Sequence, residues 1–229
     1  MIESKTKILV WDAPVRVFHW LLVLSFAGAY LTSESERWRL VHVSLGYTMG
    51  GLVAFRILWG LVGTRYARFS NFVRGPVAVI RYVQALLSGK PEHHIGHNPA
   101  GAVAIVFLLL CSFAIVVSGW AVYNDVGGNL LEELHEVASN LMLAIVAVHV
   151  AGVVVASRMH NENLVRAMLT GTKEGVPTQG IRRARLGLAI LILAAVLGFW
   201  WLQWQGAPTA TATGSTVEAA QYSARDHDD

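Results

Sequence analysis

Long apolar runs, separated by shorter polar segments, dominate the pattern of this chain. A helix that crosses a bilayer needs about 20 mostly apolar residues. Five runs approach or exceed that length, and they cover about residues 15–31, 40–62, 100–122, 134–156 and 186–204. None of them shows the alternation of polar and apolar positions that is typical of the strands of a membrane barrel. The pattern therefore predicts an all-α membrane protein.

A shorter segment, over about residues 76–88, has a different pattern. Its apolar side chains recur at helical spacing among basic and polar residues, at Val77, Ile80, Val83, Leu86 and Leu87. This pattern predicts an amphipathic helix that lies on the membrane surface. The last part of the chain, residues 206–229, is rich in Thr, Ala, Ser and Asp, and we expect it to be a disordered tail.

The composition supports the membrane assignment. Of the 229 residues, 54% are hydrophobic and only 14% are charged, whereas a soluble domain has about 25% charged residues. The net charge of +3 is small, and the basic residues lie in loops between apolar runs, so we expect no nucleic-acid partner. The single cysteine, Cys111, lies within an apolar run, which excludes an intrachain disulfide, a multi-cysteine metal site and a covalent haem motif.

The distribution of Lys and Arg predicts the orientation. These residues gather in the N-terminal arm and in the loops after the second and fourth apolar runs, while the other loops carry few. Because basic loops stay on the cytoplasmic side, we expect a cytoplasmic N-terminus and a periplasmic C-terminus.

Four histidines lie in the apolar runs: His19, His42, His135 and His149. Ionisable side chains are costly inside a membrane, and they mark functional sites there. The other five are expected to be ordinary polar residues of loops and of the tail: His93, His94, His97, His160 and His227.

Helix geometry predicts how the four histidines pair. A helix turns by about 100° and rises by about 1.5 Å per residue, so His135 and His149 lie within about 40° of one face and about 21 Å apart along the axis. They are too far apart to share one metal ion. Depth along the runs matches His19 with His149, and His42 with His135.

Two imidazoles on facing helices are suited to axial ligation of a haem iron, which takes its other four ligands from the macrocycle. Zinc would need further protein ligands, and none lies at these depths. Gly46 and Gly152 follow the histidines on the ligand faces, where they could leave room for a macrocycle, although small residues are also ordinary at helix interfaces. Arg16, Arg39 and Arg56 lie near membrane ends, where they could pair with haem propionates or simply flank the membrane.

Four segments carry a resemblance to a known family: APVRVFHW at 13–20, LVHVSLGY at 40–47, ELHEVASNL at 133–141 and AVHVAGVVVAS at 147–157. They resemble the bacterial cytochrome b561 family, which is related to the cytochrome b subunits of nickel–iron hydrogenases. The resemblance covers roughly residues 10–173 and implies a four-helix transmembrane bundle that holds two non-covalent b haems, with the four histidines as ligands. The remaining segments, 174–205 and 206–229, are then a linker with a fifth membrane helix, and the tail.

The resemblance implies transmembrane electron transfer in the bacterial inner membrane. The expected partners are the quinone pool and a periplasmic c-type cytochrome or oxidoreductase, and a homodimer is compatible with the sequence. Whether the chain is itself a quinone-linked oxidoreductase stays open. An alternative is a haem-bearing anchor subunit of a hydrogenase or another periplasmic oxidoreductase. A transporter or proton relay is a third alternative, but it would pair acids with the buried histidines, and the acids near the fourth run lie at its outer edge.

Overall fold

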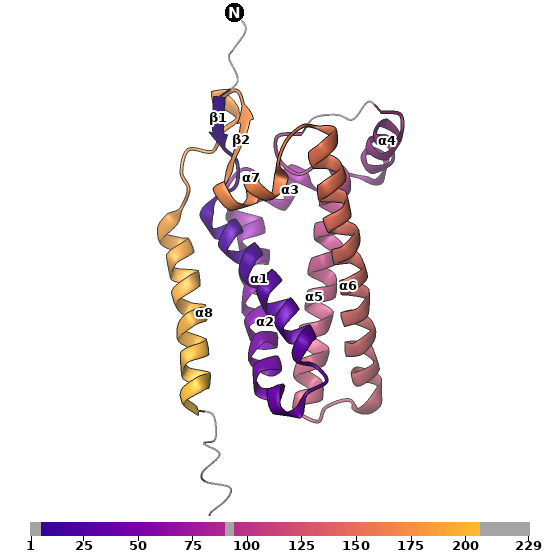
Figure 1. Cartoon of the computed structure of the whole chain (residues 1–229), viewed down its shortest axis with the longest axis vertical. Coiled ribbons are helices and arrows are strands. Elements are labelled where there is room, and N and C mark those ends of the chain that lie inside the picture. The colour runs from indigo at the N-terminus through magenta and orange to yellow at the C-terminus, as the bar shows by residue number, and fades with distance from the viewer. Residues whose placement is uncertain (1–5, 90–93, 207–229) are drawn as a thin grey trace, which may run out of the picture. The chain divides into compact units, whose positions relative to one another are not determined.

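The structure is a computed structural model of the chain, and it describes residues 6–89 and 94–206. Four long helices pack as a bundle, in which α1 lies against α2, α2 against α5, and α5 against α6 (Figure 1). Their bounds are α1 Ala13–Thr32, α2 Arg39–Val62, α5 Pro99–Tyr123 and α6 Gly128–Met159. With α8, Leu186–Gly206, five helices are long and apolar enough to cross a membrane. The prediction of an all-α membrane protein is confirmed.

The two ends of the bundle differ, and we name them by one residue each. The Asp12 end holds the starts of α1 and α5 and the ends of α2 and α6, while the Glu36 end holds the opposite termini. The short elements of the Asp12 end are β1 Thr6–Leu9, α3 Phe69–Phe72, α4 Pro76–Leu87, α7 Leu164–Thr170, β2 Thr172–Gly175 and the 3₁₀ turn Pro177–Gln179. A second 3₁₀ turn, Glu36–Trp38, precedes α2.

The strands β1 and β2 form a two-stranded antiparallel sheet that the sequence pattern did not predict. Thr6 lies opposite Gly175, and Leu9 lies opposite Thr172. Four residues per strand are too few to give a recognisable alternation of polar and apolar positions. The sheet joins the segment before α1 to the segment after α7, and so it ties the two ends of the bundle sequence together.

Capping residues explain where α1 and α5 begin. Asp12 accepts a hydrogen bond from the Val15 amide at 2.8 Å, and Asn98 accepts one from the Gly101 amide at 2.6 Å. Each cap satisfies an amide that the first helical turn leaves free. A proline then occupies the first turn of both helices, where its missing N–H costs nothing.

The helix α6 is longer than its apolar run. It begins at Gly128, after Gly127 in a left-handed conformation (φ 85°), and it ends at Met159. The expected run covered only residues 134–156, because the acidic first turns are polar although they form helix readily. The amphipathic segment expected at 76–88 forms α4, Pro76–Leu87.

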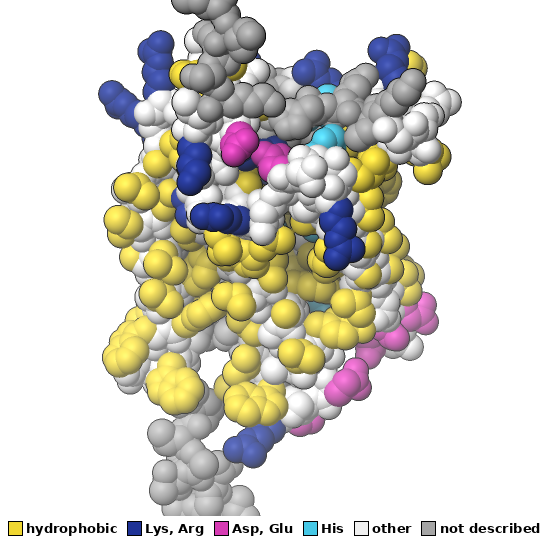
Figure 2. Space-filling view, turned by 45° about the horizontal axis from the view of Figure 1, so that its top comes forward, with side chains coloured by type: hydrophobic (Ala, Val, Ile, Leu, Met, Phe, Trp, Pro, Cys, Tyr) yellow, Lys and Arg dark blue, Asp and Glu magenta, His cyan; other side chains and the backbone are white. Residues whose placement is uncertain are grey.

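The surface of the bundle fits a membrane. Figure 2 shows hydrophobic side chains over the middle of the visible face and Lys and Arg side chains nearer the end that carries the sheet. Many large apolar side chains on the long helices are exposed, among them Leu24, Leu58, Phe107 and Val148. The chain forms two compact units, residues 1–194 and 195–229, so the last part of α8 is described by itself. The predicted disordered tail lies outside the described residues beyond Gly206.

Candidate functional site

The structure brings His42 of α2 and His135 of α6 together near the Glu36 end. Their ring centroids are 6.1 Å apart, and the ring planes meet at 72°. The two residues are separated by 93 positions in the sequence, so only the packing of the bundle creates the pair.

Hydrogen bonds orient both rings of this pair. The Nδ1 of His42 lies 2.8 Å from the carbonyl oxygen of Ala29, and the Nδ1 of His135 lies 3.0 Å from that of Ile115. A carbonyl can only accept, so each Nδ1 carries the proton. This leaves Nε2 with a free electron pair, the form in which imidazole binds a metal. The Ser118 hydroxyl, 3.2 Å from the same Nδ1 of His135, adds a second contact.

His19 of α1 and His149 of α6 form the second pair, nearer the Asp12 end. They are close enough to interact electrostatically. The Nδ1 of His19 is buried and has no hydrogen-bond partner, which is costly unless another group satisfies it. This pair is therefore less completely held by the protein alone than the pair of His42 and His135.

The glycines show where space lies beside the histidines. A Cβ added to Gly46 or Gly152 would meet no atom within 4 Å. By contrast, a Cβ added to Gly119 of α5 would lie 2.8 Å from the Cε1 of His135. Open space at Gly46 and Gly152 is compatible with a flat group beside these two helices.

The contribution of α5 could not be predicted from the sequence pattern, because this helix carries no histidine. Ile115, Ser118 and Gly119 hold or accommodate the ring of His135. The available signal was the adjacent pair Ser118-Gly119, a polar residue and a glycine within an apolar run.

The basic residues named from the sequence have different surroundings. Arg16 donates from Nη2 to the carbonyl oxygen of Leu169, and its Nε is buried without a partner. Arg39 lies at the Glu36 end, with a side chain that is 63% exposed and 4.0 Å from Glu36. Arg56 is only 3% exposed, near the Asp12 end.

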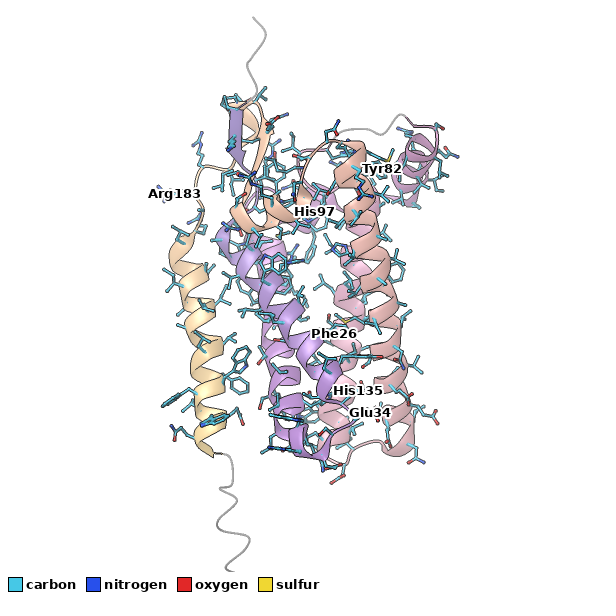
Figure 3. All side chains as sticks on the ribbon, in the orientation of Figure 1. Phe26, Glu34, Tyr82, His97, His135 and Arg183 are labelled. Carbon is cyan, nitrogen blue, oxygen red and sulfur yellow. The ribbon has the colours of Figure 1, made fainter. Side chains whose placement is uncertain are left out.

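His97 differs from the ordinary loop residue that the sequence predicted. Its ring lies between Trp11 and Phe72, with centroid distances of 4.5 Å and 4.6 Å. Burial, together with the charge of Arg56, lowers the pKa of His97 to about 3. His97 is therefore neutral, and Figure 3 shows it at the opposite end of the bundle from His135. The loop histidine was misjudged because its burial depends on segments far away in the sequence.

Paired imidazoles between apolar membrane helices, with space beside them, define a membrane cytochrome. The family model for prokaryotic cytochrome b561 matches residues 10–171, and the chain belongs to this family. It is accordingly a multi-pass membrane protein with haem b as its cofactor.

Curated relatives agree with this family. The chain is 32% identical over 142 residues to the probable Ni/Fe-hydrogenase 1 B-type cytochrome subunit of Escherichia coli (strain K12). This match covers 51% of the present chain and 60% of the Escherichia coli protein. The chain is 24% identical over 218 residues to the probable Ni/Fe-hydrogenase B-type cytochrome subunit of Rhodobacter capsulatus, with 74% and 82% covered. The match thus spans less than two thirds of the Escherichia coli relative. No solved structure matches the chain.

The contact between Gly119 and His135 gives a first prediction. In Gly119→Ala the new methyl group will displace the imidazole, because the Cβ would lie 2.8 Å from its Cε1. If His135 ligates a haem, we expect the low-spin signal of that haem to broaden or to turn partly high-spin in electron paramagnetic resonance spectra. Gly51→Ala is the matched control, since its Cβ meets nothing within 4 Å. Equal spectra for the two variants would contradict the role of Gly119.

Proposed function

We propose that this chain carries electrons across the membrane through two b haems, each held by two histidines. One haem is ligated by His42 and His135, and the other by His19 and His149. The observation that carries the proposal is the first pair, whose ring centroids lie 6.1 Å apart while Nδ1 hydrogen bonds leave both Nε2 atoms available. The haem supplies the one-electron chemistry, and the protein holds and tunes it.

Three further residues are proposed to contact the cofactors. Gly46 and Gly152 leave the space in which a macrocycle can lie beside His42 and His149. Arg16 presents a buried Nε without a partner at the Asp12 end, where it can donate to a propionate. A charged hydrogen bond of this kind is stronger than a neutral one.

The charge distribution supports a particular orientation. The basic loops meet at the Asp12 end, which we propose to be the cytoplasmic end in a bacterial inner membrane. The haem of His19 and His149 is then the cytoplasmic one, and the haem of His42 and His135 is periplasmic. Electrons would pass between the quinone pool and a periplasmic redox partner. A chain that oxidises a quinol directly would be an oxidoreductase in its own right.

A second candidate function is that of a haem-bearing membrane anchor. The relatives from Escherichia coli, Rhodobacter capsulatus and Azotobacter vinelandii are all named as probable Ni/Fe-hydrogenase cytochrome subunits. On this proposal, a hydrogenase or another periplasmic oxidoreductase docks at the Glu36 end. Copurification of a redox enzyme with the full-length chain would favour the anchor role, whereas quinol-driven activity of the isolated chain would favour an independent carrier.

The experiment that tests the proposed function counts haems and follows electrons. A pyridine haemochrome assay on the purified chain should give two b haems per chain, with none left attached after denaturation. In vesicles that enclose ferricyanide, an added quinol should reduce it through the wild-type chain but not through His149→Ala, which lacks one haem ligand. A single haem, a covalent haem, or equal rates for both chains would contradict the proposal.

A further inference from the structure

Arg56 is a buried cation with incomplete pairing. Its side chain lies in α2 near the Asp12 end and is only 3% exposed, and its Nη1 has no hydrogen-bond partner. A buried guanidinium that lacks an anion costs several kcal/mol. Arg56 also lies six residues before the end of α2, while His19 lies six residues after the start of α1. Because α1 packs against α2, both residues lie about 9 Å inside the same end.

Aromatic side chains close one side of this guanidinium. The Arg56 Cζ lies 4.7 Å from the ring centroid of Phe69 and 5.9 Å from that of Phe72. The ring of Phe69 packs against Gly60, where any Cβ would clash with it. These contacts take the guanidinium away from water, but a ring face gives only weak compensation for the lost hydration.

Asp12 is the acid that attracts Arg56 electrostatically, but its oxygens are already engaged. Its carboxylate accepts hydrogen bonds from the Val15 amide at 2.8 Å, from Trp59 Nε1 at 3.0 Å and from Thr64 Oγ1 at 2.6 Å. Within residues 6–89 and 94–206, the ion pairs join Arg39 to Glu36 and Lys173 to Glu162, and neither includes Arg56. Nη1 thus has no partner among these acids, and a further anion would satisfy it.

Other unsatisfied nitrogens lie at the same end of the bundle. Buried without a partner are Arg16 Nε, His19 Nδ1 and His97 Nδ1. Arg56 and His97 are near enough to interact electrostatically, as are His97 and His19. The charge of Arg56 and the unpartnered nitrogens of His97 and His19 thus lie within electrostatic reach of one another, which is the chemistry of a site for a carboxylate.

We propose that Arg56 binds a propionate carboxylate of the haem held by His19 and His149, and that its charge favours the reduced state of that haem. This inference rests on the proposed function. A lipid headgroup or a free anion fits less well, because Arg56 lies inside the bundle beneath Phe69 and Phe72. A carboxylate that enters with a macrocycle between the helices reaches Arg56 without a path to bulk water. The positive charge opposes the additional charge of the oxidised iron, which explains the expected direction.

The test compares Arg56→Gln with Arg56→Lys, and Arg39→Gln serves as the matched control because that arginine is 63% exposed. Each full-length holoprotein is titrated with reductant, and infrared difference spectra are recorded with haem that carries ¹³C-labelled propionates. In Arg56→Gln we expect the labelled carboxylate bands to shift, and the reduced-to-oxidised ratio of this haem at a fixed potential to fall about fifteenfold. That is the effect of removing one charge at about 10 Å with an effective dielectric constant of about 20. Arg39→Gln should change neither quantity.

The outcomes separate this inference from the function on which it rests. Unchanged propionate bands in Arg56→Gln would overturn the inference, and Arg56 would then serve only as a distant counter-charge to Asp12. If Arg56→Gln fails to fold, Arg56→Lys decides. It keeps the charge but loses the planar fork, so its bands must still shift while the ratio stays within about threefold of the wild type. If His19→Ala left both haems low-spin, the ligand assignment itself would fail, whatever Arg56 does.

Discussion

His135→Ala and His149→Ala will each remove one low-spin haem signal, and they will remove different ones. The two residues lie on the same helix, fourteen positions apart, which corresponds to about 21 Å along the axis. Loss of one imidazole leaves the iron with a single strong axial ligand, so that haem turns high-spin or is lost. Electron paramagnetic resonance spectra of the two single variants would show which signal disappears in each.

Double variants make this pairing falsifiable. His19→Ala/His149→Ala should remove little more than either single change, because residues that act as one unit give non-additive losses. His19→Ala/His135→Ala should remove both low-spin signals. If His19→Ala and His42→Ala removed the same signal, the pairing would be wrong, and α1 and α2 would have to share a haem.

Asp12→Ala will destabilise the bundle by about 3–5 kcal/mol. The carboxylate is only 1% exposed and accepts three hydrogen bonds, from the Val15 amide, Trp59 and Thr64. A hydrogen bond to a charged group contributes about 1.5–3 kcal/mol, and the donors left behind stay partly buried. The change also removes the charge that faces Arg56. Denaturant titration in detergent, followed by helix content, would measure the loss.

Asn98→Ala is the matched control for Asp12→Ala. Asn98 caps α5 by accepting a hydrogen bond from the Gly101 amide at 2.6 Å. Loss of a simple cap costs about 1 kcal/mol. Equal losses for the two variants would mean that the contacts of Asp12 with Trp59 and Thr64 contribute nothing.

The sequence was most informative about ionisable residues, because burying them in a membrane costs free energy. Histidines inside apolar runs could be found directly, because a membrane makes them expensive, and helix geometry alone separated His135 from His149. The positions of the membrane helices followed from the apolar runs for the same reason. The exception was the start of α6, where acidic residues concealed six further helical residues before position 134.

What the sequence could not predict depends on contacts between distant segments. His97 looks like any polar loop residue until Trp11 and Phe72 enclose it. Ser118 and Gly119 acquire a role only when α5 packs beside His135. The burial of Arg56 likewise needs α3, which lies beyond the end of its own helix. None of these environments produces a periodic pattern of polar and apolar positions in the segments that form it.

The pairing of β1 with β2 has a consequence for biosynthesis. Leu9 pairs with Thr172, and Thr6 with Gly175, so the first strand has no partner until the ribosome has made nearly all of the first unit. At about 5–20 residues per second, that delay lasts on the order of 10–30 s. Throughout this time α1 already exists while the segment before it is untethered. The Asp12 end therefore closes only after β2 has been synthesised, which makes it the last part of the bundle to gain its sheet.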